Sequence, residues 1–375
     1  MQCLFFSGNV QASKTGNRQL RREIFQVIPG GIVKKYLNTL FITRQGTYLS
    51  KEDETIAINI DHKTVSRIPA LSINGIICFG NISVSPFLMG YCAENNISLS
   101  FLSEHGKFLA NVIGKKNGNV LLRRSQYRVA DDPDFSLKIS KGMIIAKIYN
   151  CRTVLNRALR DHSEKINSEK IEEASEYLKY HALKADKSLN MQELRGIEGD
   201  CAKTYFSVFD ELILAQKDTF NFKGRTRRPP LDNVNCLLSY LYTLLMYDVR
   251  SALESVGLDS YVGFFHTDRP GRASLALDMM EEWRPVIADR LALSLINREQ
   301  LNSRDFKKTE SGAVILSDEG RRTMLESYQK RKADEISHPY LKETIPVGLL
   351  FYTQALLLAR FLRGDIDGYP AFLWK

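Results

Sequence analysis

The spacing of hydrophobic residues changes character about a third of the way along the chain and predicts two domains. From Tyr36 onward, short β-branched and aromatic runs such as TIAINI and IICFG are separated by turn residues. Such runs are typical of strands, whereas the longer stretch 86–96 predicts a helix. We therefore expect a small β-rich domain over residues 35–117, which ends in the Gly- and Lys-rich segment 114–118.

Beyond this segment, apolar residues recur three and four positions apart, a spacing that predicts amphipathic helices. Helices are expected over 121–132, 142–162, 170–186 and 193–215, and further helices from about Asp232 and Ser274, with Ser274 as an N-cap. The fold class is therefore α+β, a small β-rich domain followed by a larger all-α domain over residues 118–375. Residues 1–34 show no periodicity, and we expect them to form a poorly ordered N-terminal extension.

The charge balance points toward a polyanionic partner. The chain carries 52 Lys and Arg against 43 Asp and Glu, a formal net charge of +9. A positive field favours polyanions through the release of counterions, so nucleic acid is the first partner to consider. Charge alone does not separate nucleic-acid binding from the many basic proteins that bind none.

Cysteines and apolar windows predict a cytoplasmic protein outside the membrane. Six scattered cysteines form no C-x-x-C pair, which fits reduced, buried thiols better than disulfides or a zinc site. The most apolar windows are 237–247, which is too short to span a bilayer, and 347–362, which Thr353 and Gln354 interrupt. Both windows are expected to be core helices.

One stretch, GFFHTDRPGRASLALDMMEEWR over residues 263–284, combines a histidine with several carboxylates. Asp278 and Glu281 are three residues apart, so on a helix they share one face and can converge on one point; Glu282 could replace Glu281 geometrically. His266 precedes the helix, and its loop could fold the imidazole over that face. This donor set suits Mg²⁺ or Mn²⁺, and the histidine favours Mn²⁺.

The same residues also permit a simpler interpretation. Arg269, Arg272 and Arg284 could pair with the acids on the protein surface, and spacing alone does not decide between ion pairs and a metal site.

Two further segments carry comparable signals. In LRGIEG, Glu198 lies between Gly196 and Gly199, which permit close approach of a backbone or a ligand; the alternative is that the glycines serve helix packing and Glu198 is solvated. The loop GRTRRPP holds three arginines beside two prolines, a compact basic arrangement suited to phosphate contacts or to simple solvation.

Taken together, these motifs resemble a known family. LRGIEG at 194–199, GRTRRPPxDxVN at 224–235 and HTDRPGRxSLxxDxxEEWRP at 266–285 are similar to the CRISPR-associated adaptation integrases, the Cas-one family. The closing ARFLRGDIDGYPAFLW at 359–374 resembles the subtype I-C branch. The resemblance covers about residues 34–375, and Val33-Lys34-Lys35-Tyr36 is similar to a family start, which indicates translation from Val33 through an alternative codon.

The resemblance implies a metal-dependent DNA endonuclease and integrase that inserts short double-stranded spacers into a CRISPR repeat array by transesterification. It implies Mg²⁺ or Mn²⁺ held by Glu198, His266 and Glu281, with Asp278 as a further acidic position in the catalytic pocket. It also implies a homodimer that works with a Cas-two partner, and the β-rich domain is where we expect the dimer contact. Our candidates for DNA contacts are Arg225, Arg227, Arg228, Arg269 and Arg272.

Two other functions fit the same residues. A general structure-selective nuclease of DNA repair would use the same pocket on branched DNA. A non-catalytic DNA-binding scaffold would use the acids in ion pairs alone.

Overall fold

A computed structural model describes residues 33–36, 39–73, 75–95, 97–103, 108–112 and 120–374 of the chain. Contacts divide the chain into two compact units, Met1–Lys115 and Lys116–Lys375, and each is described here by itself. Residues 1–32 of the expected extension and the whole expected junction at 114–118 lie outside the described residues. Val33 and Lys34, which the sequence assigned to the extension, belong to a strand instead.

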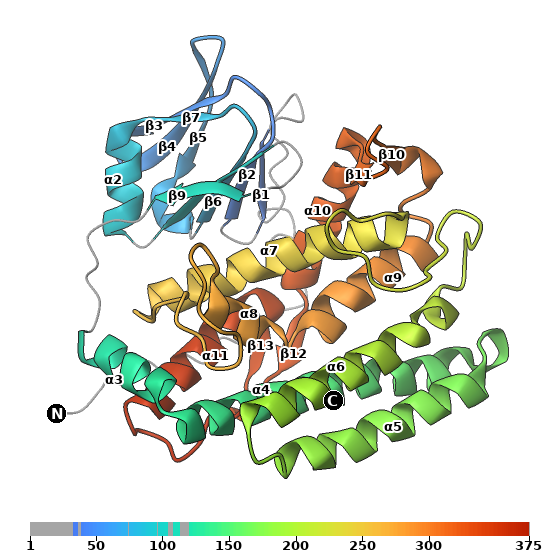
Figure 1. Cartoon of the computed structure of the whole chain (residues 1–375). Helices are drawn as coiled ribbons and strands as arrows, with labels where there is room; N and C mark the ends of the chain where they lie inside the picture. The colour runs from blue at the N-terminus through green and yellow to red at the C-terminus, as the bar shows by residue number, and fades with distance from the viewer. Residues whose placement is uncertain are drawn as a thin grey trace, which may run out of the picture. The chain divides into compact units, whose positions relative to one another are not determined.

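The N-terminal unit consists of two sheets (Figure 1). A five-stranded sheet has the order β1 (Val33–Tyr36), β2 (Thr39–Ile42), β6 (Gly75–Phe79), β8 (Ser98–Leu102) and β9 (Phe108–Val112). A four-stranded sheet has the order β5 (Lys63–Pro69), β4 (Thr55–Ile60), β3 (Tyr48–Glu52) and β7 (Ser83–Val84).

The apolar runs of this unit form its core. Strand β6 lies between two parallel neighbours, β2 and β8, and all five of its residues are buried, which explains its uninterrupted apolar sequence. Helix α2 (Pro86–Glu94) packs Leu88 and Cys92 into the same core. The Ser85 hydroxyl caps α2 by accepting a hydrogen bond from the Leu88 amide, so the predicted helix is confirmed in type and start.

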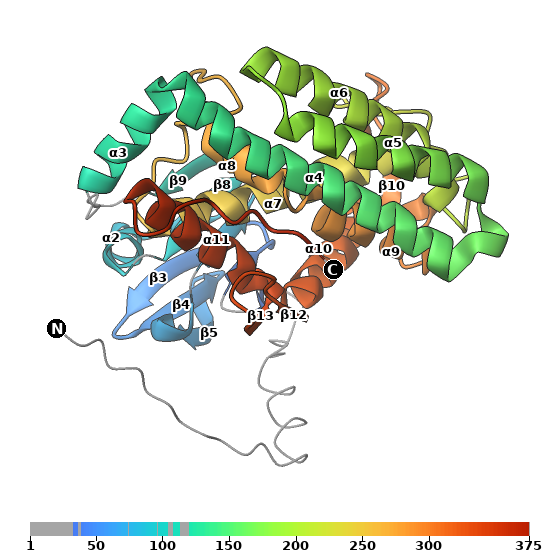
Figure 2. The same cartoon turned by 90° about the horizontal axis from the view of Figure 1, so that it is seen from below.

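The C-terminal unit is mostly helical. Its helices are α3 (Val120–Asp131), α4 (Pro133–His162), α5 (Ser168–Asp186), α6 (Met191–Ser207), α7 (Asn233–Ser255), α8 (Ser274–Met280), α9 (Arg290–Asn297), α10 (Asp318–Lys332) and α11 (Val347–Leu362). Helices α4, α5 and α6 lie side by side, and the long α7 runs beside α8 and α11 (Figures 1 and 2). Side-chain caps explain several starts, because Asp132, Asn167, Asn190 and Asp232 each accept backbone N–H bonds at a helix N-terminus.

The α+β class is confirmed, with corrections of detail in the C-terminal unit. Two short hairpins, β10 (Phe306–Lys308) with β11 (Val314–Leu316) and β12 (Glu335–Ser337) with β13 (Thr344–Pro346), interrupt the expected all-α domain. Strands of three residues are too short to show a periodic pattern. Ser274 is the first residue of α8 rather than its N-cap, and its hydroxyl donates to the Thr267 carbonyl at 3.2 Å.

The helix that begins at Ser274 is short, and Pro285 lies in the turn that follows it. Helix α8 stops at Met280, and a π-helical turn over Arg284–Asp289 leads into α9. Pro285 has no N–H to donate to the carbonyl four residues earlier, so the α-helical ladder cannot continue there. Glu281 and Glu282 therefore lie in the connection between two helices.

Glu282 anchors the C-terminal segment of the chain. Its fully buried carboxylate accepts hydrogen bonds from the Phe372 amide (2.7 Å), the Tyr369 hydroxyl (2.7 Å) and the Gln354 amide (3.2 Å). Asn150 of α4 completes the anchor by donating to the carbonyls of Glu282 and Phe372 at 2.7 and 2.9 Å. The segment after α11 is thereby tied to α4 and to the connection after α8.

The described cysteines, Cys78, Cys92, Cys151, Cys201 and Cys236, are all buried and free, as the sequence predicts; Cys3 lies outside the described residues. Among the helices of the described ranges, none combines the length and apolar character that crossing a membrane requires.

Burial of Glu282 predicts a pH-dependent contribution to stability. Burial raises the pKa of Glu282 to about 7, although hydrogen bonds from Phe372, Tyr369 and Gln354 act in the opposite direction. The unfolded chain releases this proton near pH 4.5, so the stabilisation is complete below pH 4.5 and is lost as pH rises toward 7. We expect Glu282→Gln to remove this loss. Between pH 4.5 and pH 7, the free energy of unfolding of the variant should therefore rise relative to that of the wild type by up to about 3 kcal/mol.

Urea denaturation from pH 5 to pH 8 measures this difference. Glu173→Gln, at an exposed position of α5, is the matched control and should follow the wild type. Parallel curves for wild type and Glu282→Gln would refute the assignment.

Candidate active site

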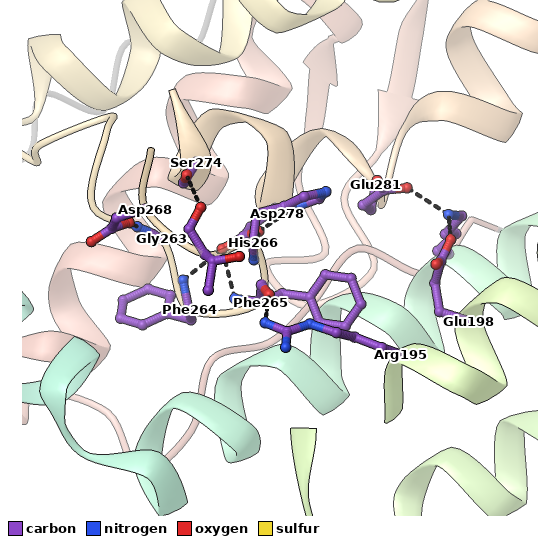
Figure 3. A network of polar contacts seen from close by, with 12 residues as sticks. Arg195, Glu198, Gly263, Phe264, Phe265, His266, Asp268, Ser274, Asp278 and Glu281 are labelled. Carbon is purple, nitrogen blue, oxygen red and sulfur yellow. Dashed lines mark hydrogen bonds and ion pairs between the residues drawn. The ribbon is translucent and has the colours of Figure 1, made fainter. Parts of the chain in front are cut away.

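The loop before α8 is built around one carboxylate, that of Asp278 (Figure 3). Its oxygens accept the backbone N–H groups of Phe264 (2.6 Å), Phe265 (2.9 Å) and His266 (2.9 Å). Asp278 is 1% exposed, so these bonds form in a medium that strengthens them. Gly263 permits the close approach, because a Cβ there would lie 2.8 Å from an Asp278 oxygen and from the Ser274 Cβ. Asp278 thus fixes the course of the loop.

Asp278 also orients the imidazole of His266. The Nδ1 atom of His266 lies 2.6 Å from Asp278 Oδ1, and since a carboxylate accepts, we assign the ring proton to Nδ1. The lone pair then resides on Nε2. The half-buried His266 lines an open cavity of about 450 Å³ together with Arg195 and Tyr127, so this side of the histidine loop is accessible to a ligand.

Two other carboxylates converge on a lysine that the sequence analysis missed. Lys147, from the middle of α4, pairs through its Nζ with Glu198 of α6 and, at 2.8 Å, with Oε2 of Glu281. Arg284 approaches the other oxygen, Oε1, at 2.8 Å. Glu281 is 3% exposed, and a buried carboxylate needs such cationic partners to stay ionised.

The charge states follow from these contacts. Burial favours the neutral form of Glu281, but the cations Arg284 and Lys147 outweigh it and lower the pKa to about 2. For Lys147, burial likewise favours the neutral form, but Glu281 and Glu198 outweigh it and raise the pKa above its usual range. At neutral pH Glu281 is therefore ionised and Lys147 carries its positive charge.

Asp278 and Glu281 have different partners. Asp278 accepts hydrogen bonds from the histidine loop, whereas Glu281 pairs with Lys147 of α4 and with Arg284 (Figure 3). In the part of the chain that the structure describes, no three His, Cys, Asp or Glu side chains meet in a metal-binding arrangement. The ion-pair alternative holds for Arg284; Arg269 is exposed and Arg272 partly exposed.

The Gly-Ile-Glu-Gly segment lies within α6, which runs through both glycines. A Cβ at Gly196 or Gly199 would meet nothing within 4 Å, so neither glycine serves packing inside the chain. Arg195, on the same helix, donates to the Phe265 carbonyl at 2.6 Å and lies 5.7 Å above the Phe265 ring. This residue ties α6 to the histidine loop.

The arginine loop contains two kinds of arginine. The guanidinium of Arg225 donates to Asn235 Oδ1 (2.6 Å) and to the Thr226 carbonyl (2.8 Å) and lies 5.1 Å from the Tyr242 ring centroid. These internal bonds make Arg225 a residue that shapes the loop rather than a free phosphate ligand. Arg227 and Arg228 are exposed.

The missed lysine left a faint trace in the sequence. Lys147 interrupts the apolar run MIIAKIY over 143–149 on a helix whose neighbouring positions are buried. A lone charge at such a position needs a buried partner, but nothing in the sequence indicates that the partners are Glu198 and Glu281.

The Asp278 contacts predict a stability effect. Asp278→Asn replaces one acceptor oxygen by a donor that faces N–H groups, so the loop loses hydrogen bonds inside a buried site. We expect a loss of about 1–3 kcal/mol in the free energy of unfolding, measured by urea denaturation. Asp268→Asn is the control, because exposed Asp268 accepts a single long bond from Gly263 at 3.4 Å; equal effects of the two variants would contradict the role of Asp278.

Comparison with known proteins bears on identity. The family described as CRISPR associated protein Cas1 matches residues 40–330. Over 92% of its length the chain is 54% identical to the CRISPR-associated endonuclease Cas1 1 of Chlorobaculum tepidum, and it covers 100% of that relative. It is 48% identical to the CRISPR-associated endonuclease Cas1 2 of Rhodospirillum rubrum, again over 92% of this chain and 100% of the relative.

Solved structures share the fold. A CAS1 protein from Thermotoga maritima has a TM-score of 0.71 at 24% identity, over 86% of this chain and 96% of the other. A casposase bound to integration product has a TM-score of 0.76 at 23% identity, over 90% of this chain and 94% of the other. The family match, the long alignments and the shared fold agree, and the chain belongs to the Cas1 family of CRISPR-associated endonucleases.

Proposed function

We propose that this chain is a divalent-metal-dependent DNA endonuclease and integrase of CRISPR adaptation, which inserts short DNA spacers into a repeat array. The observation that carries the proposal is the position of Glu198 and Glu281 around one cation, close to a histidine whose ring is fixed by Asp278. Relatives named CRISPR-associated endonucleases support the activity, and a casposase bound to integration product supports integration on this fold.

The donor set fits Mg²⁺ or Mn²⁺. Glu198, His266 and Glu281 would hold the ion, since two carboxylates and one neutral imidazole suit these metals. The position between Glu198 and Glu281 already attracts a cation, the Lys147 ammonium. When bound, the ion would lower the pKa of the attacking hydroxyl or water and neutralise charge that develops on the phosphate.

The chain's own residues have separate roles in this site. His266 would bind the ion through Nε2, because Asp278 holds its Nδ1. Asp278 is a positioning residue, since both of its oxygens are engaged by the loop. Arg284 holds Oε1 of Glu281, and Oε2 faces the Lys147 ammonium.

The reaction is a displacement at phosphorus. The 3′-hydroxyl oxygen of an incoming duplex forms a bond to the phosphorus at the edge of a repeat, and the bond from phosphorus to the existing 3′-oxygen breaks. The number of phosphodiester bonds is unchanged, so no energy source is required. If water attacks instead, the same geometry gives hydrolysis, which accounts for both endonuclease and integrase activity.

We propose that arginines with exposed or partly exposed side chains bind the DNA. Arg227 and Arg228 on the arginine loop and Arg269 and Arg272 on the histidine loop are our candidates for contacts with backbone phosphates.

Partners and branch complete the proposal. We propose a homodimer that works with a Cas2 dimer in the cytoplasm, and a place in the subtype I-C branch. A fold neighbour described as a Cas6-RT-Cas1–Cas2 complex supports the partner. Strands β5 and β9, which are edge strands of the N-terminal sheets in the described part of the chain, are the proposed dimer contact.

The central test is an integration assay with His266→Ala. The protein and its Cas2 partner are incubated with a short duplex, a plasmid that carries the repeat, and Mn²⁺ or Mg²⁺. We expect joined and cleaved products with the wild type and a loss of at least about a hundredfold with the variant, while its thermal unfolding stays close to wild type. A folded, active variant would exclude the site; cleavage that prefers branched DNA, without joining, would favour a repair nuclease; and DNA binding without chemistry would favour a scaffold.

The exposed arginines predict a salt-dependent affinity. Arg227→Ala with Arg228→Ala should weaken duplex binding regardless of sequence and lower the slope of log affinity against log salt by about one for each phosphate that is no longer neutralised. Fluorescence anisotropy at several salt concentrations measures the slope. Arg225→Ala is the contrasting variant, and it should lower the unfolding temperature because Arg225 is bonded within the loop. If the slope is unchanged in the variant that lacks both Arg227 and Arg228, this loop does not contact DNA.

A further inference from the structure

Lys147 is the contact between the two acidic elements of the site. It comes from α4, whereas Glu198 lies on α6 and Glu281 follows α8, so three separate parts of the chain meet at its ammonium. Lys147 is 8% exposed. Figure 3 shows the carboxylate of Glu281 pointing toward the side of the site where Glu198 lies.

The carboxylates of Glu198 and Glu281 both contact the Lys147 ammonium, and they would repel each other without a cation between them. The effect is strong because Glu281 is almost fully buried and Glu198 is partly buried, so water screens their charges poorly. The ammonium therefore keeps the two carboxylates close together. Without any cation, Glu198, which is the more exposed partner, would turn toward solvent.

The two cations at Glu281 differ in how readily they can leave. Arg284 holds Oε1 through a guanidinium that also lies 5.1 Å from the Tyr242 ring centroid, so both its charge and its plane are fixed. Lys147 holds Oε2 through a compact ammonium on a flexible stem. Arg284 is suited to orient the carboxylate permanently, whereas Lys147 is suited to be exchanged.

We infer that Lys147 is the resident cation of the acidic pair: it holds Glu198 and Glu281 at ligating separation, and a divalent metal binds by taking its place. This inference rests on the proposed function, since it concerns the same metal site. Lys147 is accordingly a positioning residue that also competes with the metal.

The test compares Lys147→Met with the wild type in the full-length protein, by Mn²⁺ titration calorimetry and by thermal unfolding with and without Mn²⁺. Without metal, the variant should unfold at a lower temperature, because the two carboxylates no longer share a cation. It should bind Mn²⁺ at least tenfold more tightly than the wild type, and Mn²⁺ should close most of the gap in unfolding temperature. Lys147→Arg, which retains a bulkier cation, should bind Mn²⁺ more weakly than the wild type.

Lys332→Met is the matched control. Lys332, the last residue of α10, is also buried. Its ammonium pairs at 2.9 Å with a single acid, Asp248 of α7. This variant should be destabilised as well, but Mn²⁺ should leave its deficit unchanged. If Lys147→Met does not fold without metal, Lys147→Gln keeps hydrogen-bond donors near the carboxylates and serves in its place, and folding that is restored by Mn²⁺ supports the inference.

Two failures can be told apart with Glu198→Gln. If the wild type binds Mn²⁺ in a manner that requires Glu198, but Lys147→Met binds equally or more weakly, the competition is overturned and the metal site stands. If the wild type and both variants bind no Mn²⁺, the metal site of the proposed function falls, and the inference falls with it.

Discussion

The interruption of the helix after Met280 is the constraint on which the rest of the site depends. In a continuous helix, Asp278 and Glu281 would share one face. Glu282, the next residue, would lie about 100° further round the helix. After Met280 the α-helical ladder gives way to turns in which Glu281, Glu282 and Trp283 each donate to the carbonyl three residues earlier, and the three carboxylates have separate partners. Asp278 organises the histidine loop, Glu281 faces α4 and α6, and Glu282 anchors the C-terminal segment. The short stretch from Asp278 to Glu282 thus contacts the histidine loop, helices α4 and α6, and the C-terminal segment.

The electrostatics of the site follow from its burial. Glu281 stays ionised because Arg284 and Lys147 flank it, whereas Glu282, its direct neighbour, has hydrogen-bond donors but no cation, and its pKa rises to about 7. Two adjacent glutamates in the same connection therefore have opposite shifts, and the difference lies in their partners rather than in the depth of burial. A carboxyl group that binds a metal ion must be ionised, as Glu281 is. Glu282 only accepts hydrogen bonds that anchor the C-terminal segment, and this role does not require a low pKa.

The sequence predicted the features that depend on local chemistry. The sequence indicated a helix from about Asp232, which caps α7, and the β-branched run IICFG indicated the strand β6. Residues that depend on tertiary contacts were beyond it. Lys147 lies about fifty positions from Glu198, and no periodicity connects them. The same limit explains why Arg225 was grouped with Arg227, although its internal partner Asn235 lies ten residues further on.

The anchoring of the C-terminal segment bears on how firmly the site is held. Asn150 donates to the carbonyls of Glu282 and Phe372 and accepts from the Trp374 amide, and it lies on α4 three residues after Lys147. Residues three apart share a helical face, so one stretch of α4 holds both the acidic pair and the end of the chain. Displacement of that segment would release the backbone on both sides of Glu282, next to Glu281. The position of this carboxylate is therefore set from two directions, by its cations and by the C-terminal segment that holds its neighbour.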